Sequence, residues 1–340
     1  MPNPTKVIPG KTSPAKRSRA AVRPVLPGPA QADLSPHLAQ EANLSASDSA
    51  AKAFRLIAAS AMAQMSANAA VLARARRPEA LHQMRVGLRR LRGAISLFGP
   101  MLADDSLAAI KGELKWITGE LGPARDLDVF LNESYRPLLE PHRDWPELAN
   151  LGHALREART QAYDRAQAAV TSSRLGVLAH DLAAWIETGA WTTDAGPKQT
   201  ALRARPIGRL APELLTQARK TVVKHGHKLK TLDPEARHKL RIQAKRLRYT
   251  AGFFGSLYAG DAPKAYKRFG KASREVTSAL GDQTDIVAAA SLAAEIAASA
   301  SPRVAYTAGR VAAERLAGEA GAMKVSLKAL KAFRKTERFW

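Results

Sequence analysis

The sequence predicts an all-α protein built from two helical halves. Apolar residues recur at helical spacing over long stretches, as at Phe54, Ile57, Ala58 and Ala61, which follow the pattern i, i+3, i+4, i+7. Clusters of β-branched residues and hairpin dipeptides, both typical of strands, are scarce from about Lys52 onward. Proline and glycine also interrupt the chain at intervals that suit helical hairpins. We therefore expect antiparallel helices and no sheet.

The first 50 residues are expected to form a tail. Residues 1–30 hold seven prolines, six basic residues and no acidic residue. Prolines at this density block helices and sheet ladders, which predicts a disordered basic segment. Such a segment is either an electrostatic arm for a polyanion or a solvated leader. The prolines disfavour a mitochondrial transit peptide, and the start lacks the apolar core of a secretory signal.

Helix-breaking residues divide the rest of the chain into four or five helices on each side of a boundary near residues 190–205. We expect the first half to cover residues 51–195 and the second half to cover residues 203–340. The breaks are predicted at Arg77-Pro78, Gly99-Pro100, Gly122-Pro123, Pro141, Gly196-Pro197, Pro212, Asp233-Pro234, Gly260 with Pro263, Gly281 and Ser301-Pro302.

The two halves share sequence landmarks. Residues 81–92 align with residues 237–248 at an offset of 156, and both stretches repeat a His, several Arg and a basic pair in the same order. Farther on, residues 121–126 align with residues 280–285 at an offset of 159, and both begin with Leu-Gly and end with Asp. Two landmarks in the same order predict a bundle that arose by internal duplication.

The charge of the chain points to an anionic partner. Its 340 residues include 53 Lys or Arg and 30 Asp or Glu, which gives a formal net charge of +23. Such a surface attracts nucleic acid, anionic lipid or phosphate polymers. Cysteine is absent, which excludes disulfide scaffolds, Cys-based zinc sites and thiol catalysis. No run of 18 uncharged apolar residues exists, so we expect no membrane-spanning helix.

A cationic stripe repeats in both halves. At about 100° per residue, His82, Arg85, Arg89 and Arg92 share one narrow face of a helix whose opposite face is apolar. Arg90 and Arg246 lie on the flanks of the stripes, and the second stripe consists of His238, Arg241, Lys245 and Arg248. Charges spaced about 4.5 to 6 Å along each helix suit a linear chain of phosphates better than a rigid duplex. The alternative is a solvated charged face.

Further polar residues allow two interpretations each. His82 and His238 lack a second His at i+4, so we expect hydrogen bonds to phosphate rather than metal binding. Asp126 and Asp285 follow Gly-bearing turns and are expected to cap the following helices, and for Asp126 the alternative is that it orients Arg125 or a neighbouring stripe Arg. No positioned nucleophile with a base and an orienting carboxylate is apparent, so we expect no catalytic site. Additional charge for the groove is predicted from Lys111, Lys115, Lys267, Lys271, Arg274, Arg219, Lys220, Lys224, His225 and His227.

These motifs resemble the conserved histidine α-helical domain, or CHAD, family. The resemblance rests on residues 79–92, 122–129 and 238–249 and extends over roughly residues 50–340, including the terminal Arg338-Phe339-Trp340. It implies two four-helix bundles related by pseudo-twofold symmetry, with a basic central pore that binds inorganic polyphosphate. It also implies association with polyphosphate granules, their proteins or enzymes of polyphosphate metabolism.

The resemblance implies a specific set of polyphosphate contacts. They are His82, Arg85, Arg89, Arg90, Arg92, His238, Arg241, Lys245, Arg246 and Arg248, with Lys115 and Arg125 as weaker transfers and Arg219 and Lys220 as additional candidates. The second half departs from the pattern because Thr284 stands where the first half has Arg125. The chain also lacks the tunnel-type phosphohydrolase domain of some members, which argues against hydrolysis.

We therefore expect a non-enzymatic, cofactor-free polyphosphate-binding protein of the cytoplasm, located on polyphosphate granules. Two alternatives stay open at this point. One is a basic helical protein that binds nucleic acid, although no helix-turn-helix or RNA-recognition signature is present. The other is a polyphosphate hydrolase or transferase.

Overall fold

A computed structural model of the chain describes Met1 and residues 34–340, apart from residues 194–195, 259 and 261. The predicted disordered segment falls largely on residues 2–33, which lie outside the described residues. The described part of the chain is helical and contains no strand, only an isolated bridge between Ser49 and Pro206. The all-α prediction is confirmed.

The helices of the first half follow each other with short connections. They are α1 (Ala50–Arg74), α2 (Pro78–Leu97), α3 (Ser106–Glu120), α4 (Gly122–Phe130), α5 (Arg136–Leu139), α6 (Glu147–Thr171) and α7 (Ser173–Thr188). A π-helical turn, Leu131–Tyr135, joins α4 to α5. Helix α8 (Pro197–Ala204) packs against α1 and connects the two halves.

The second half contains fewer and longer helices. They are α9 (Ile207–Gly226), α10 (Pro234–Phe253), α11 (Pro263–Ser299), α12 (Pro302–Ala317) and α13 (Glu319–Lys335). Two predicted breaks are wrong, because Pro212 lies inside α9 and Gly281 lies inside α11. Pro212 is the sixth residue of α9, so this helix continues through a position that cannot donate the usual N–H bond to the preceding turn.

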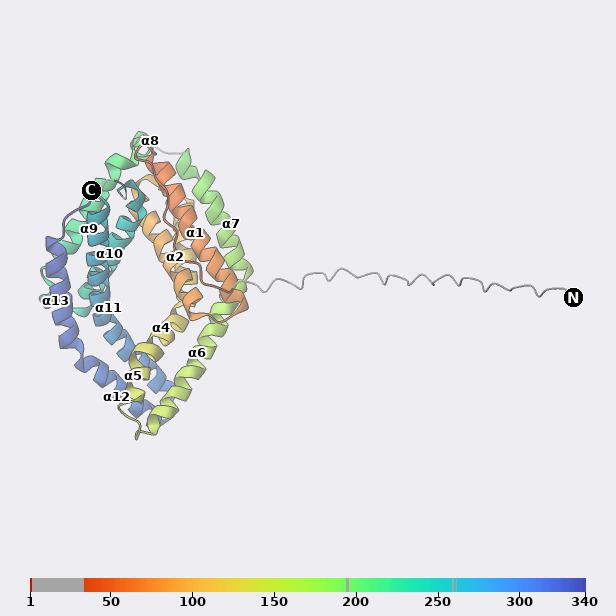
Figure 1. Ribbon diagram of the computed structural model, residues 1–340, viewed down its shortest axis with the longest axis vertical. Helices are drawn as coiled ribbons and strands as arrows, with labels where there is room; N and C mark the ends of the chain where they lie inside the picture. The colour runs from red at the N-terminus through yellow and green to blue at the C-terminus, as the bar shows by residue number, and fades with distance from the viewer. Residues whose placement is uncertain (2–33, 194–195, 259, 261) are drawn as a thin grey trace. The chain divides into compact units, whose positions relative to one another are not determined.

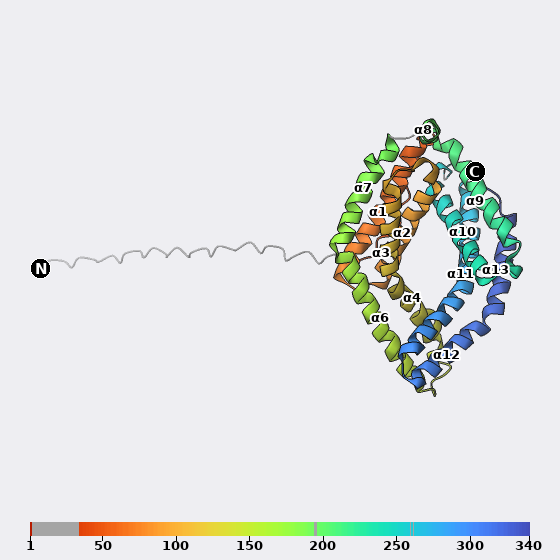
Figure 2. The ribbon, with the colours of Figure 1, turned by 180° about the vertical axis from the view of Figure 1, so that it is seen from behind.

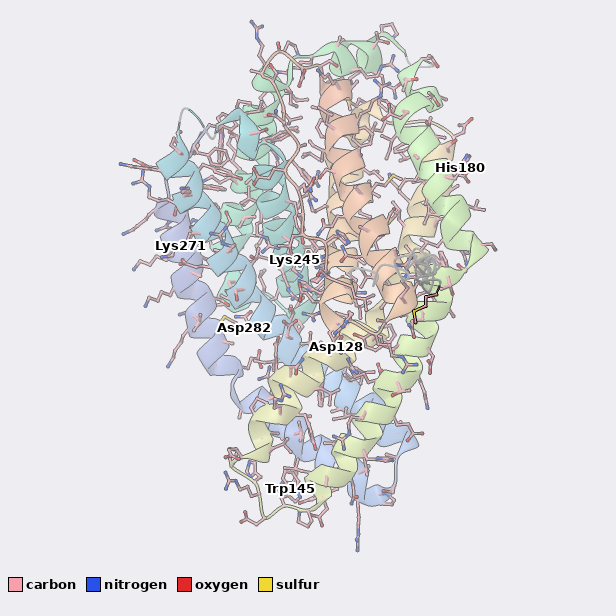
Figure 3. The ribbon with its side chains drawn as sticks, turned by 45° about the vertical axis from the view of Figure 1, so that its right-hand side comes forward. Asp128, Trp145, His180, Lys245, Lys271 and Asp282 are labelled. Carbon is pink, nitrogen blue, oxygen red and sulfur yellow. The ribbon has the colours of Figure 1, made fainter. Side chains whose placement is uncertain are left out.

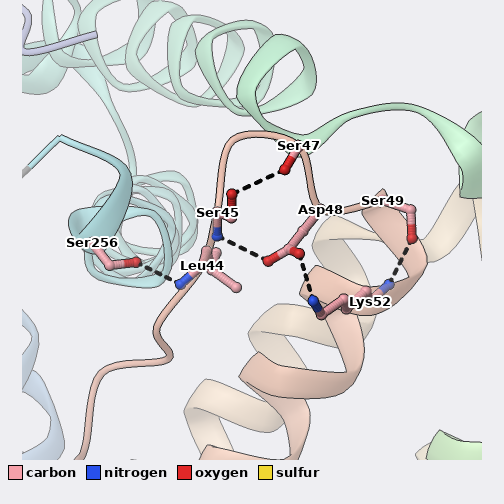
Figure 4. Close-up of polar contacts among 7 residues, drawn as sticks. All are labelled: Leu44, Ser45, Ser47, Asp48, Ser49, Lys52 and Ser256. Atoms are coloured by element: carbon pink, nitrogen blue, oxygen red, sulfur yellow. Dashed lines mark hydrogen bonds and ion pairs between the residues drawn. The ribbon is translucent and has the colours of Figure 1, made fainter.

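Local signals explain several helix starts. Proline occupies the first position of α2, α10, α11 and α12, where its missing N–H is not needed. The Asp233 carboxylate accepts a hydrogen bond of 2.7 Å from the backbone N–H of Ala236 and caps α10. The Ser49 hydroxyl accepts one of 3.2 Å from the backbone N–H of Lys52 and caps α1 (Figure 4).

The two halves lie side by side and meet through matching helices. Helices α9, α10, α11 and α13 lie on one side, and α1, α2, α6 and α7 lie on the other (Figures 1 and 2). Helix α2 contacts α10 across the middle, and α6 contacts α12 at the far end. Gly87 lets α2 approach α1 closely, because a Cβ there would lie 2.9 Å from the backbone nitrogen of Met65.

Each half has an aromatic cluster in its core. Phe54 of α1 makes edge-to-face contacts with Phe98, Trp185 and Trp191, at centroid distances between 5.4 and 5.9 Å. In the second half, Phe269 contacts Phe333 and the C-terminal Phe339 and Trp340 at 5.1 to 5.4 Å. Such pairs add stability beyond the burial of their area. The aromatic clusters therefore stabilise the two halves to which the helices with the basic stripes belong.

The segment before α1 differs from the prediction. We expected the tail to reach residue 50, but residues 34–49 pack against both halves. Ala42 and Leu44 are buried, and the Ser256 hydroxyl bonds to the Leu44 N–H and the Ala42 carbonyl at 3.1 and 2.9 Å (Figure 4). Two buried apolar side chains and paired backbone groups anchor this stretch, although its composition resembles a linker.

Helix α1 also differs from the expectation that no helix could cross a membrane. This helix is long and apolar enough to span a membrane, and it is the only such helix among the described residues. Half of the apolar stretch is buried inside the protein, and a core helix has the same length and composition. On the buried face of α1, Phe54 and Ile57 are fully buried in the core, whereas Leu56 is exposed.

Candidate anion-binding site

A pocket between the two halves gathers basic side chains from both. Its volume is about 310 Å³, and helices α2, α4, α10, α11 and α12 contribute to its walls. Six basic side chains, five arginines and one lysine, face three carboxylates there. The charged lining residues are Arg85, Arg89, Arg125, Arg241, Lys245 and Arg315, then Asp126, Glu133 and Asp285, with His82 beside them.

The amphipathic pattern of α2 and α10 produces this arrangement. On α2, Leu81, Met84 and Leu88 are fully buried, so the basic face of the helix must turn away from the core of its own half. On α10, Leu240 and Leu247 are buried in the same way. Because α2 and α10 face each other across the middle, their basic faces line one pocket.

Arg85 and Arg241 occupy matching places. The Arg85 Nη1 donates a hydrogen bond of 3.0 Å to the Thr118 carbonyl, and the Arg241 Nη2 lies 3.1 Å from the Asp285 carboxylate. The Nε atoms of Arg85, Arg241 and Arg315 are buried without a hydrogen-bond partner. A buried donor without an acceptor costs about 1–3 kcal/mol, so this pocket carries unsatisfied cationic groups.

Lys245 is the most perturbed base in the pocket. Burial lowers its pKa, and the neighbouring Arg241 and Arg89 lower it further, to about 8. Figure 3 places Lys245 on the side of α10 that faces the first half. Removing a charge from water beside like charges disfavours the protonated amine. The close approach of these positive charges therefore costs free energy, and a bound anion would offset this cost.

His82 is also held in a cationic environment. Burial lowers its pKa, the positive charge of Arg125 lowers it further, and Glu79 only partly opposes this. An imidazole ordinarily gains its charge at a pKa near 6.5. The structure lowers that transition, because the pocket without an anion repels the imidazolium.

The two aspartates do not cap helices. Asp126 lies inside α4 and Asp285 lies inside α11, so the prediction that they cap helices is wrong. Asp285 pairs with Arg241. Although Asp126 as a residue is exposed, desolvation of its carboxyl raises its pKa, against the opposing charges of Arg85 and Arg125. The Asp285 carboxylate therefore orients the Arg241 guanidinium before any ligand binds.

Comparison with known proteins identifies the fold family. A family model described as the CHAD domain matches residues 56–294. The chain belongs to the CHAD domain family.

Solved structures agree with this assignment. The CHAD domain from the plant Ricinus communis is 27% identical, with a TM-score of 0.74, over 89% of this chain and 99% of that one. The protein PptA from Streptomyces chartreusis is 19% identical, with a TM-score of 0.59, over 84% of this chain and 100% of that one, and this second likeness shows the fold alone. No curated protein matches the sequence significantly.

The two halves of this CHAD domain contribute unequally to the pocket. The first half supplies His82, Arg85, Arg89 and Arg125, whereas the second supplies Arg241, Lys245 and Arg315. Thr284, which aligns with Arg125, bonds through its hydroxyl to the Gly281 carbonyl of its own helix at 2.9 Å. Sequence analysis missed Arg315, because residues 302–317 carry no motif that distinguishes it from a surface arginine. Arg315 adds a cation to the second half's side of the pocket, where Thr284 provides none.

Arg90 does not belong to the site, contrary to the prediction. Its side chain is 8% exposed, and its guanidinium donates hydrogen bonds to Gln64 Oε1, the Gln40 carbonyl and Ser60 Oγ at 2.9 to 3.2 Å. These bonds tie α2 to α1 and to the segment before it. Since its donors are satisfied within the protein, Arg90 has a structural role.

Other predicted contacts lie around the pocket rather than in it. Arg92 is exposed and lies 3.5 Å from Thr118 Oγ1. Arg246 is exposed and donates a bond of 3.3 Å to the Ser96 carbonyl, and His238 is exposed and does not line the pocket. Arg248 stacks on Tyr249, whose hydroxyl accepts a bond of 3.3 Å from Arg89. Tyr249 therefore connects the pocket to a neighbouring one that Arg248 and Arg274 line.

The remaining predicted residues lie elsewhere. Arg219 donates to the carbonyls of Arg334 and Thr336 at 2.9 and 3.2 Å, so it fastens the C-terminal segment instead of binding a ligand. His225 contacts Gln243 Oε1 at 2.7 Å. Figure 3 shows Lys271 toward the outside of the second half. Exposed residues that do not line the pocket are Lys111, Lys115, Lys220, Lys224, His227, Lys267 and Lys271.

Proposed function

We propose that this pocket binds inorganic polyphosphate and that the protein associates with polyphosphate granules in the cytoplasm. The observation that carries the proposal is the convergence of six basic side chains from both halves on one pocket with three carboxylates. Arginine grips phosphate oxygens through parallel N–H bonds, and five of the six cations are arginines. A flexible phosphate chain can enter a space of about 310 Å³ that a nucleic-acid duplex cannot.

The proposed role is binding without catalysis. The Asp285 carboxylate pairs with Arg241, which supports an orienting role for it over a role as catalytic base. Granule proteins or enzymes of polyphosphate metabolism are the partners that this role implies. Incubation with polyphosphate and Mg²⁺ or Mn²⁺ tests the proposal, and phosphate release that His82→Ala abolishes would overturn it.

A titration with polyphosphate of defined length tests the binding itself. In the double variant Arg85→Glu/Arg241→Glu, two charge-assisted contacts of about 1.5 kcal/mol each are lost, so affinity should fall about 100-fold or more. The matched control is Lys198→Glu/Lys264→Glu, which lowers the net charge of +23 by the same amount at two exposed positions outside the pocket. Equal losses in both variants would refute a specific site.

Competition distinguishes polyphosphate from nucleic acid. At equal phosphate concentration, duplex DNA should fail to displace long-chain polyphosphate, because the duplex cannot reach Arg85 and Arg241 inside the pocket. Displacement by DNA would favour the nucleic-acid alternative.

A further inference from the structure

A second basic surface lies on the outer side of the second half, between α9 and α13. A groove of about 330 Å³ has a floor of apolar residues and glycine, made of Val223, Gly226, Leu327, Leu330 and Phe333. Its edges are basic, and no acidic residue lines it. The edge residues are His227, Lys230, Lys331 and Arg334. This composition differs from the central pocket, where cations and carboxylates mix.

The two helices of the groove run antiparallel. Arg219, in the middle of α9, bonds to the carbonyls of Arg334 and Thr336 at the end of α13. Farther along α9, a Cβ at Gly226 would lie 2.9 Å from the Leu330 Cδ2, so the helices are in close contact there. A shallow channel between two antiparallel helices is a shape that accepts a third helix.

Lysines extend the basic edges along both helices. Those on α13 follow a single face at spacings of four, three and four residues, and those on α9 continue from Lys220 through Lys224 toward His227. No ion pair joins these lysines to a carboxylate within the described part of the chain. The lysines of α13 are Lys324, Lys328, Lys331 and Lys335, all exposed.

Two arginines of the first half are neutralised by glutamates. Arg165 pairs with Glu120 at 2.6 Å, and Arg174 pairs with Glu113 at 2.7 Å. Exposed lysines without an ion pair among the described residues also lie on α3 and α11, but those of α9 and α13 flank an apolar groove.

The first half also covers the corresponding surface with its own chain. The 156-residue offset aligns Val71 and Leu72 of α1 with His227 and Lys228. Val71 and Leu72 are 3% and 0% exposed, and Gln167 of α6 donates a bond of 3.1 Å to the Leu72 carbonyl. His227 and Lys228 are exposed. The second half thus offers an uncovered groove where the first half is closed by a further helix.

We propose that the groove between α9 and α13 binds an acidic amphipathic helix of a partner protein. The basic edges require a negatively charged occupant, and the apolar floor favours one that also carries apolar side chains. Polyphosphate and nucleic-acid backbones carry no such side chains. The chain's own residues 1–30 contain no acidic residue, so their charge is wrong for this groove. The proposal is independent of polyphosphate binding in the central pocket.

A designed peptide tests this proposal on the full-length protein. The probe is a fluorescent helical peptide of about 16 residues, with Leu at i, i+3, i+4 and i+7 and Glu on both flanks. Fluorescence anisotropy should show saturable binding. The double variant Lys230→Glu/Lys331→Glu should weaken this binding at least about tenfold, because it reverses both edges. Leu327→Gln should weaken it through the floor, and thermal melts of each variant verify that it is folded.

Controls separate the groove from general charge attraction. A peptide with Ser in place of Leu keeps the same charge and should bind at least about tenfold more weakly than the Leu peptide. Lys198→Glu/Lys264→Glu changes the net charge equally and should retain binding. The Lys230→Glu/Lys331→Glu variant should still bind short polyphosphate, which distinguishes this groove from the central pocket.

Several outcomes would overturn the proposal. They are absence of peptide binding, equal binding of the Ser peptide, and equal binding by the edge variant. Loss of long-chain polyphosphate binding in the edge variant would assign this surface to polyanions instead. A concentration-dependent dimer that the edge variant abolishes would assign it to a second copy of the chain.

Discussion

Raising the pH from 7 to 9 should weaken polyphosphate binding, and Lys245 should be the cause. Without ligand, the pKa of Lys245 is lowered to about 8 by burial and by Arg241 and Arg89. A phosphate chain among these cations stabilises the ammonium form, so binding at high pH must be accompanied by proton uptake. The affinity should therefore decrease as the free protein loses this proton.

The size of the decrease in affinity follows from the shift in the pKa of Lys245. With a free-state pKa of about 8 and a bound-state value near the usual 10.5, about nine in ten molecules carry the proton at pH 7 and about one in eleven at pH 9. The dissociation constant should thus rise about tenfold, or about 1.4 kcal/mol. The internal phosphates of a long chain keep a constant charge over this range. Burial and the charge of Arg125 lower the pKa of His82, which moves its titration away from this alkaline range.

Isothermal titration in buffers of different ionisation enthalpy measures both affinity and proton uptake. Lys245→Arg is the matched control, because arginine keeps its charge throughout and should give a nearly flat profile. Tyr249, whose pKa the charges of Arg89 and Arg248 lower against the effect of burial, remains in both proteins, so its contribution cancels. A wild-type affinity that is constant from pH 7 to 9, or an equal decline in Lys245→Arg, would refute the reasoning.

Three further predictions concern stability and the acidic range. Lys245→Met should stabilise the ligand-free protein by up to about 3 kcal/mol at pH 7. The reason is that the pKa of Lys245 is lower in the folded state than in the unfolded state, which destabilises the fold at pH below about 8. A thermal melt without stabilisation would contradict this. The penalty fades as the pH rises from 8 to 10.5, so the two melting curves should converge there. Arg90→Met should destabilise the fold by about 2–3 kcal/mol, because the hydrogen-bond acceptors of Arg90 lose their donor. The polyphosphate affinity should not change. Weaker binding by the folded variant would show that Arg90 belongs to the site. Affinity should increase in the acidic range. There His82, whose pKa is lowered by burial and by Arg125, gains its charge, and Asp126, whose pKa is raised by burial, loses its charge earlier than an ordinary aspartate; His82→Gln/Asp126→Asn should abolish that increase.

The sequence predicts the helical faces of the site well because they obey a simple geometric rule. A helix that buries Leu81, Met84 and Leu88 must present Arg85 and Arg89 on its opposite side. The same rule places Arg241 and Lys245 on α10. Their convergence on one pocket needed the contact between α2 and α10, which periodicity alone does not reveal.

Residues at the edge of a stripe are harder to assign. Arg90 lies on the flank of the α2 stripe, where a small rotation of the helix decides whether a side chain faces the pocket or the interior. Its partner Gln40 lies in the segment before α1, whose pairing depends on contacts distant in sequence. Arg315 was missed for the opposite reason, since only the packing of α12 brings it to the pocket. Both cases depend on tertiary contacts without a local signal.

The helix end predicted at Gly281 is wrong, because this glycine does not end a helix. Gly281 lies within α11, beside the Arg241 guanidinium, so it marks a close approach of a side chain and not a turn. The aspartate four residues later was therefore interpreted as a cap, although it pairs with Arg241. A glycine followed by an aspartate has the same sequence pattern in both situations.

A crystal structure with a polyphosphate of defined length would test the central claim most directly. The account predicts a phosphate chain between α2 and α10, with its oxygens about 2.7–2.9 Å from nitrogen atoms of Arg85, Arg89, Arg241 and Lys245. A phosphate chain bound only to the outer faces, with the space between α2 and α10 holding none, would contradict it.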